Sequence, residues 1–331
     1  GREQLHASLR GDPRVTSREG CDIRSLTPVD LGEPPTLADI DVLQRMSAER
    51  PRSVDLYRRE GDPATRANLK VFSRGTAISL SARVPVLENM GFRVVNERTY
   101  NITPQPAAGE AADSTRVWLH DMTLERADDG EIDVARLGPA LEAAMMAQFR
   151  GLAESDRFDQ LVLAAGLAWR EASLLRALGR YLRQVGAPYA QGYIADALAR
   201  HPAIAAGLVA LFIAKFDPRL GDGDRGQKME AERKAIETAL DAVSSLDEDR
   251  ILRRLVNLID AALRTNFFQI GPDGQPRGTI SIKYDCAKVD SLPLPRPLYE
   301  IFVYSPRVEG IHLRFGKVAR GGLRWSDRPQ D

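Results

Sequence analysis

The spacing of apolar residues changes twice along this chain of 331 residues, and no other feature limits its possible folds as much. Short runs of alternating apolar and polar residues lie within 53–150, and a period of two indicates half-buried strands. Within 155–266 the apolar residues recur at the period of an amphipathic helix. After Gly278 the period of two returns. We therefore predict an α+β chain in which a helical segment separates two β-containing parts.

The first β-containing part, residues 51–152, is predicted to be a ferredoxin-like domain with the element order β-β-α-β-β-α. The expected strands lie at 53–58, 68–73, 92–100 and 116–124, and a second helix at 133–149. The first helix is expected between Ser79 and Gly91, with Leu80, Val84 and Leu87 on its apolar face. In a βαββαβ sheet the last strand lies beside the first. Here the leading strand, paired as a hairpin with its successor, can fill that edge position.

The helical segment, residues 153–268, contains one long apolar stripe. Its members are Leu167, Leu174, Leu175, Leu178, Tyr181, Leu182 and Val185, and the arginines that are expected to fall largely away from it are Arg170, Arg176, Arg180 and Arg183. Further helices are expected at 191–200, 203–215, 226–244 and 245–263. Ser245 and Glu248 form the pattern of a capping box.

The glycine-rich stretch Gly221–Gly226 is predicted to be a flexible connection. Its acidic residues do not have the ligand spacing of a calcium loop. A dinucleotide-binding loop would have to follow a strand, and no strand is expected there. The two ends of the chain complete the domain prediction: residues 1–50 form a connector with a short helix at 36–49, and residues 269–331 contain strands at 280–285, 298–304 and 311–315.

Composition excludes several classes of function. The 46 basic and 46 acidic residues leave no basic excess for nucleic acid or an anionic membrane surface. No apolar run approaches the roughly 20 residues of a membrane span. The two cysteines lie far apart and fit a reducing cytoplasm, and the four histidines lack metal-ligand spacing, so we expect structural histidines and no metal. RNA binding by the first sheet is disfavoured, because Phe72 and Trp118 lack the accompanying RNA-binding signature.

The segment Arg320-Gly-Gly-Leu-Arg324 carries the clearest chemistry. Glycines let a ligand approach the backbone closely, and an arginine offers a bidentate fork to a carboxylate. On these residues alone an ordinary turn is the commoner explanation. The chain has no initiating Met and runs out in a charged, glycine-rich segment, so we expect both ends to be internal to a longer protein.

Several longer segments bear a resemblance to one enzyme family. They are 86–94, 118–121, 168–172, 181–184, 246–254, 263–269 and 300–328, and the last of them contains Val318-Ala-Arg-Gly-Gly-Leu-Arg-Trp-Ser-Asp327. These segments are very similar to the large bacterial NAD-specific glutamate dehydrogenases. The resemblance covers about residues 50–331, so the chain looks like an internal part of such an enzyme, with the start of its catalytic domain at the C-terminal end.

This resemblance implies a cytoplasmic, homo-oligomeric enzyme that converts L-glutamate to 2-oxoglutarate and ammonium and passes hydride to NAD⁺. It implies that residues 51–152 form an ACT-like regulatory domain with a possible amino acid effector. The substrate-binding residues would be Arg320, Gly321, Gly322 and Arg324, with Arg320 at the position where smaller glutamate dehydrogenases carry Lys. The catalytic Lys and the NAD-binding Rossmann domain would lie beyond residue 331, so this part would be inactive alone. The alternative is an amino-acid-sensing or oligomerisation module.

Overall fold

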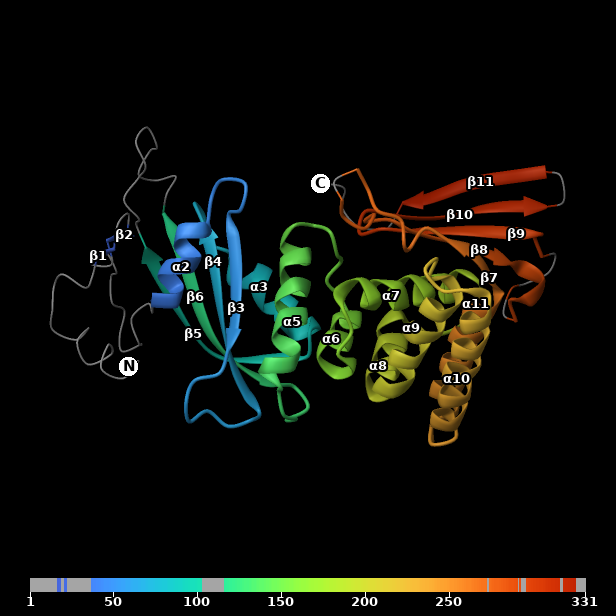
Figure 1. Cartoon of the computed structure of the whole chain (residues 1–331), viewed down its shortest axis with the longest axis horizontal. Helices are drawn as coiled ribbons and strands as arrows, with labels where there is room; N and C mark the ends of the chain where they lie inside the picture. The colour runs from blue at the N-terminus through green and yellow to red at the C-terminus, as the bar shows by residue number, and fades with distance from the viewer. Residues whose placement is uncertain are drawn as a thin grey trace. The chain divides into compact units, whose positions relative to one another are not determined.

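The computed structural model describes residues 17–18, 21–22, 37–102, 116–272, 274–290, 292, 296–315 and 318–325. They belong to two compact units, the first built from residues 1–88 and 92–146 and the second from 89–91 and 147–331 (Figure 1). The predicted combination of helices and sheets is confirmed, and the sheets are antiparallel. The expected loop at 104–112 lies outside the described residues.

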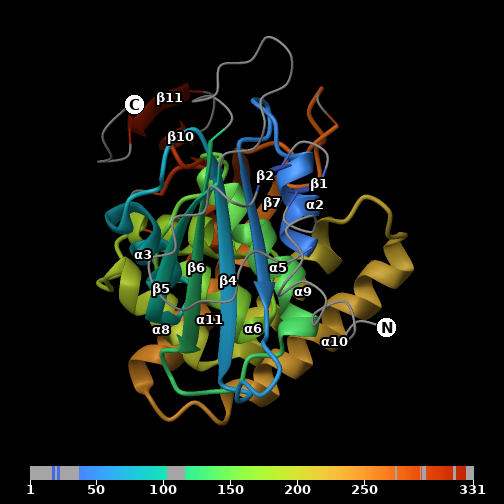
Figure 2. The same ribbon diagram turned by 90° about the vertical axis from the view of Figure 1, so that its left-hand side faces the viewer.

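The first unit is built on a four-stranded antiparallel sheet in the order β3-β4-β6-β5. Its strands are β3 (Arg52–Tyr57), β4 (Arg66–Arg74), β5 (Phe92–Ile102) and β6 (Val117–Arg126). All four strands are thus where the alternation predicted them, and Figure 2 shows β5, β6 and β4 side by side. A separate two-residue pair, β1 (Ser17–Arg18) and β2 (Cys21–Asp22), precedes them.

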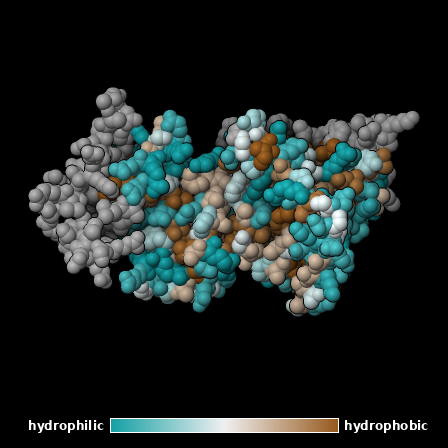
Figure 3. All heavy atoms as spheres, in the orientation of Figure 1, coloured by the Kyte–Doolittle hydropathy of each residue, from teal (hydrophilic) through white to brown (hydrophobic). Residues whose placement is uncertain are grey.

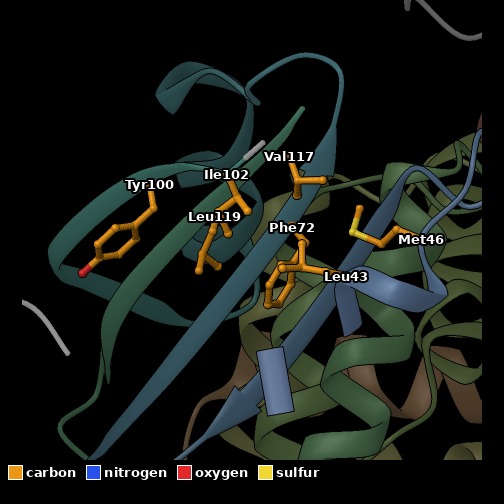
Figure 4. Close-up of a cluster of buried hydrophobic side chains, with 7 residues drawn as sticks. All are labelled: Leu43, Met46, Phe72, Tyr100, Ile102, Val117 and Leu119. Atoms are coloured by element: carbon orange, nitrogen blue, oxygen red, sulfur yellow. The ribbon is translucent and has the colours of Figure 1, made fainter. Parts of the chain in front are cut away.

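Helices cover both faces of this sheet. They are α2 (Leu37–Arg45), α3 (Leu80–Asn89) and α5 (Val134–Phe149), with α2 on one face and α3 and α5 on the other (Figure 1). Beneath α2 lies a buried cluster made of Leu43, Met46, Phe72, Tyr100, Ile102, Val117 and Leu119 (Figure 4). Each such apolar side chain stabilises the fold by about 1.5–3 kcal/mol when fully buried, so this cluster holds α2 on the sheet.

The predicted apolar face of α3 is wrong in one respect. Leu80 is 58% exposed, whereas Arg83 is only 4% exposed. The guanidinium of Arg83 donates hydrogen bonds to the carboxylate of Glu97 and to the carbonyl of Ile78, and these partners offset the cost of burying its charge. Gly91 ends the helix with a φ of +87°, as its type predicts.

The second unit begins with a block of helices. Their bounds are η2 (Arg157–Asp159), α6 (Gln160–Ala165), α7 (Trp169–Gln184), α8 (Gln191–Arg200), α9 (Pro202–Phe216), α10 (Asp222–Leu240) and α11 (Leu246–Ala261). The stripe predicted on α7 is buried, from Leu174 to Val185. Arg176, however, is fully buried instead of lying away from the stripe, because Asp156 and Asp159 both pair with its guanidinium.

Two details at the ends of α10 and α11 differ from the prediction. Helix α10 already starts at Asp222, so Gly221–Gly226 is mostly helix and not a flexible connection. The Arg225 guanidinium holds this start by donating to carbonyls at the end of α9, among them Lys215 at 2.6 Å. At α11, Ser245 accepts from the Glu248 amide as expected. The Glu248 carboxylate pairs instead with Arg200 and His201 of the neighbouring segment.

A five-stranded antiparallel sheet completes the second unit, in the order β11-β10-β9-β8-β7. Its strands are β7 (Ala262–Thr265), β8 (Ile280–Asp285), β9 (Tyr299–Tyr304), β10 (Val308–Phe315) and β11 (Val318–Trp325), and the short helix η3 (Cys286–Lys288) follows β8. Every strand neighbours the next one in sequence. Strands β8, β9 and β10 match the predicted alternation, whereas β11 was not expected to be a strand.

Hydrophilic and hydrophobic side chains are interspersed on the face shown in Figure 3. Among the described residues, no single helix is both long and apolar enough to cross a membrane. Helices α8 and α9 pass that test only when they are taken together, and they meet at an angle of 101°.

Candidate functional site

The predicted substrate-binding residues lie in β11 and not in a loop. Their backbone pairs with β10 in a regular register: Arg320 opposite Leu313, Gly321 opposite His312, Gly322 opposite Ile311 and Arg324 opposite Glu309. Strand β11 is also the last strand of the sheet order. Glycine inside a strand weakens it but permits close approach of a ligand or another backbone. The two glycines therefore suit a ligand-facing edge better than a central strand.

Residues that lie directly opposite one another on neighbouring strands form rows across the sheet, and three such rows include β11 residues of the candidate site. Arg320, Gly322 and Arg324 share their rows with Glu300, Phe302 and Tyr304 of β9, through the intervening residues of β10. The same rows reach Tyr284, Ile282 and Ile280 in β8. Residues directly opposite one another on paired strands belong to one face of a sheet. The β8 and β9 members of these rows are all buried, at 4% exposure or less. Gly321 belongs to the alternate set of rows.

Glu300 is a buried carboxylate among tyrosines. The hydroxyl of Tyr181 in α7 donates a hydrogen bond to Glu300 Oε2. The Tyr181 ring also stacks on Tyr284, with 4.1 Å between ring centres and planes only 2° apart. Burial raises the pKa of Glu300, and the hydrogen bond from Tyr181 partly opposes this rise. Burial also raises the pKa of both tyrosines, Tyr181 and Tyr284.

A second contact joins Tyr304, the last buried residue of β9, to the segment just before η2. The Tyr304 hydroxyl donates to Glu154 Oε2 at 2.8 Å. Glu154 also pairs with Arg180 of α7 at 2.5 Å, and Arg180 lies 3.8 Å from Glu309 of β10. Glu154, Tyr304 and Glu300 were not among the residues predicted to form the site. Tyr181, a polar-tipped residue inside the apolar stripe, was the one available signal.

The first unit contains a second group of buried polar side chains, around His120. His120 is 2% exposed, and its Nδ1 lies 3.2 Å from Glu97 and 3.0 Å from Thr99. Burial lowers the pKa of His120, and the positive charge of Arg83 lowers it further. Its Nε2 has no hydrogen-bond partner among the described residues. These contacts hold the ring inside the first unit, and a structural role for His120 stays a prediction. No group of three His, Cys, Asp or Glu side chains in the described part of the chain is arranged to hold a metal ion.

The opposite face of the same sheet is closed by ion pairs. Lys70 of β4 donates to both oxygens of Asp39 in α2, at 2.8 and 2.7 Å. Asp121 of β6 accepts from Tyr57 at 3.1 Å and from Arg59 at 2.8 Å. Phe72 is fully buried beneath α2. An RNA-binding sheet presents free cations and aromatic rings on its middle strands, and this face offers neither at Lys70 and Phe72.

Comparison with known families gives three matches in chain order. Residues 51–137 match the family described as glutamate dehydrogenase, ACT3 domain. Residues 153–218 match glutamate dehydrogenase, helical motif 3. Residues 235–331 match bacterial NAD-glutamate dehydrogenase, catalytic domain. The last match begins within α10, earlier than the boundary near residue 269 that the change of period suggested.

Curated relatives agree with these matches. The chain is 43% identical over 296 residues to the NAD-specific glutamate dehydrogenase of Halomonas elongata, a match that covers 88% of this chain. It is 42% identical over 297 residues to that of Pseudomonas aeruginosa, covering 89%. It is 40% identical over 314 residues to that of Mycobacterium tuberculosis, covering 93%. In each case the match spans only 18% of the relative's own length.

Proposed function

Since the chain belongs to the bacterial NAD-specific glutamate dehydrogenase family, we propose that it is part of an enzyme that oxidatively deaminates L-glutamate. In that reaction glutamate, NAD⁺ and water give 2-oxoglutarate, ammonium, NADH and a proton. The observation that carries the proposal is the catalytic-domain match over 235–331, which includes the whole sheet from β7 to β11.

Within that reaction the role proposed for β11 is to bind a substrate carboxylate. Glutamate and 2-oxoglutarate carry two carboxylates each, and a guanidinium binds a carboxylate through two parallel hydrogen bonds. Arg320 and Arg324 are the proposed cationic contacts, and Gly321 and Gly322 the positions where the ligand approaches the backbone. The two glycines in β11 support this role, because glycine inside a strand permits the close approach of a ligand to the backbone.

The rest of the chemistry is assigned to other parts of the whole protein. The chain spans 18% of the length of the relatives it matches. We assign NAD⁺ binding and the activation of the attacking water to parts of the relatives that this chain does not cover. The chain's own contribution is then the edge of the substrate site and the modules that support it, and we expect no turnover from the chain alone.

For residues 51–152 we propose a ferredoxin-like, ACT-like regulatory domain. The strand order β3-β4-β6-β5 supports it, since β3 occupies the edge position that the last strand takes in a βαββαβ sheet. The match to an ACT3 domain over 51–137 supports it independently. An amino acid effector, a homo-oligomeric state and a cytoplasmic location are parts of the same proposal. The alternative, a module used only for amino acid sensing or oligomerisation, also agrees with the ACT3 match.

The enzyme proposal is tested with the whole protein that contains this chain. We expect glutamate-dependent formation of NADH, and Arg320→Met should raise the KM for glutamate about 10-fold or more, because a charged contact is worth about 1.5–3 kcal/mol. Arg320→Lys should retain part of the affinity, since it keeps the charge. Arg264→Met, on the exposed strand β7, removes the same group elsewhere in the sheet and should have no effect. Absence of glutamate-dependent activity in the wild-type protein would refute the proposal.

The regulatory alternative has its own measurement. Calorimetry of the whole protein with single amino acids should detect an effector whose heat survives Arg320→Met, because the effector site is assigned to the first unit. Binding that disappears with Arg320→Met would place the ligand in the substrate site instead. Heat from an effector in a protein without glutamate-dependent activity would favour the sensing module over the enzyme.

A further inference from the structure

Three of the proposed substrate-binding residues of β11 lie opposite β10 residues that in turn lie opposite buried residues of β9. These buried residues of β9 pack against the helical segment. The β9 members of the rows of Arg320, Gly322 and Arg324 are Glu300, Phe302 and Tyr304. These three residues are 4%, 1% and 2% exposed. The Phe302 ring centre lies 5.4 Å from that of Tyr181. Each of the three rows is therefore anchored, two strands from β11, by a residue packed against the helical block.

Two of these anchors are directional hydrogen bonds. Tyr181 donates to Glu300, and Tyr304 donates to Glu154. Apolar packing tolerates small sliding movements because the hydrophobic effect has no preferred direction. A buried carboxylate that loses its donor bears the full cost of its desolvation. A shift of β9 relative to Tyr181 in α7 and Glu154 before η2 would break both bonds, so the sheet has one favoured position on these two residues.

The two bonds also lie one above the other along β9. Glu300 and Tyr304 are four residues apart on the same face of one strand, which separates them by about 13 Å. One hydrogen bond would leave the strand free to pivot about it. Two such bonds at this spacing fix both the position and the direction of β9. Because β10 pairs with β9 and β11 pairs with β10, the positions of these strands are fixed as well.

We propose that Tyr181 and Glu154 are positioning residues for the substrate site, acting through Glu300 and Tyr304 of β9. The helical block then sets where β11 stands relative to the rest of the active site, in addition to linking domains. This inference rests on the proposed function, since it concerns the glutamate site. It adds a specific assignment: the affinity for glutamate depends on two hydroxyl groups that lie two strands or more from the substrate.

The test uses the whole protein carrying Tyr181→Phe or Tyr304→Phe. Each variant removes one hydroxyl and leaves the ring. The KM for glutamate should rise about fivefold or more, the lower end of couplings between distant sites, while the KM for NAD⁺ stays unchanged. Tyr189→Phe is the matched control, because the Tyr189 hydroxyl donates to Asp247 at 3.3 Å on the surface, away from β9. An unchanged KM for glutamate in both variants, or an equal rise in both KM values, would overturn the proposal.

A conservative replacement separates positioning from general damage. Glu300→Gln keeps an oxygen that accepts from Tyr181, so it should retain a KM for glutamate close to that of the wild-type protein. Glu300→Leu removes the acceptor and should behave like Tyr181→Phe. If both Glu300 variants raise the KM for glutamate equally, the hydrogen bond is not what positions the site.

A measurement without turnover distinguishes this inference from the proposed function. Hydrogen exchange of the whole protein should be faster in Tyr181→Phe than in Tyr189→Phe over residues 299–304 and 318–325. This difference does not require an active enzyme. A difference in an inactive wild-type background would leave the positioning contact standing and refute the enzyme. Equal exchange in the two variants would refute the positioning role whatever the activity.

Discussion

Arg176 and Asp159 form a buried ion pair, in which the fully buried guanidinium donates to the carboxylate at 2.7 Å. Asp156 accepts a second hydrogen bond from Arg176 at 2.8 Å. A buried pair of this kind adds little net stability compared with apolar packing, but breaking it leaves a buried charge without a partner. The pair joins η2 to α7 at the start of the helical block.

Replacing only one residue of this ion pair should therefore lower the free energy of unfolding. We expect Arg176→Met to destabilise the second unit by about 3–5 kcal/mol, as for other broken buried pairs. Urea unfolding measures this, in a Trp118→Phe background that leaves tryptophans only in the second unit. Arg250→Met is the control, since Arg250 and its partner Asp247 are 55% and 56% exposed and solvent screens their pair. Equal losses in the two variants would contradict the argument.

The same pair predicts a pH dependence. Burial raises the pKa of Asp159 from 3.8 to about 6, although Arg176 opposes the rise. The folded state then binds the proton more tightly than the unfolded state does. The stability contributed by this proton is present below about pH 3.8 and is lost as the pH rises through about 6. Asp159→Asn should therefore flatten the stability of the second unit between these values, and curves that remain parallel would show that Asp159 does not titrate there.

Removing the hydroxyl of Tyr284 is expected to leave the stability of the protein unchanged or to raise it. This hydroxyl is buried and has no hydrogen-bond partner among the described residues. Tyr284→Phe should leave the stability unchanged or raise it, by up to about 1–3 kcal/mol, the cost of an unsatisfied buried group. Tyr304→Phe removes a hydroxyl that is bonded to Glu154 and should lower it. Thermal unfolding of the two variants compares them, and a clear loss in Tyr284→Phe would reveal an unseen partner.

Removing the Ser245 hydroxyl at the start of α11 is expected to lower the stability of the protein. This hydroxyl accepts from the Glu248 amide, one of the amides without a partner inside the helix. Ser245→Ala should cost about 1 kcal/mol, the usual value of an N-cap. Ser244→Ala, the exposed neighbour, removes the same group outside the cap and should cost nothing measurable. Denaturant unfolding of the pair gives the difference, and equal stabilities would show that the cap is unimportant.

Local patterns predicted most elements of this fold. Alternation located β3 to β6 and β8 to β10, and Gly91 and Gly186 end their helices with the positive φ that glycine permits. The errors arose where a distant partner changed the outcome. Arg83 and Arg176 are buried because Glu97 and Asp159 neutralise them, and periodicity treats every arginine as exposed.

The residues of the candidate site stay a prediction, and their surroundings in the sheet were not predicted from the sequence. These residues came from the family resemblance and from the chemistry of Arg and Gly. Their strand conformation was missed because paired glycines are poor strand formers, and only the full register with β10 supports them. The contact between Tyr181 and Glu300 joins residues 119 positions apart, and no local pattern in one sequence reveals it.

The separation of Tyr181 and Glu300 in the sequence also sets a delay between their synthesis on the ribosome. A ribosome adds roughly 5–20 residues per second, so the 119 residues between Tyr181 and Glu300 take about 6–24 s to synthesise. During this interval Tyr181 has been made while Glu300 and Phe302 have not. Its contacts with β9 can therefore form only after nearly the whole chain has been synthesised.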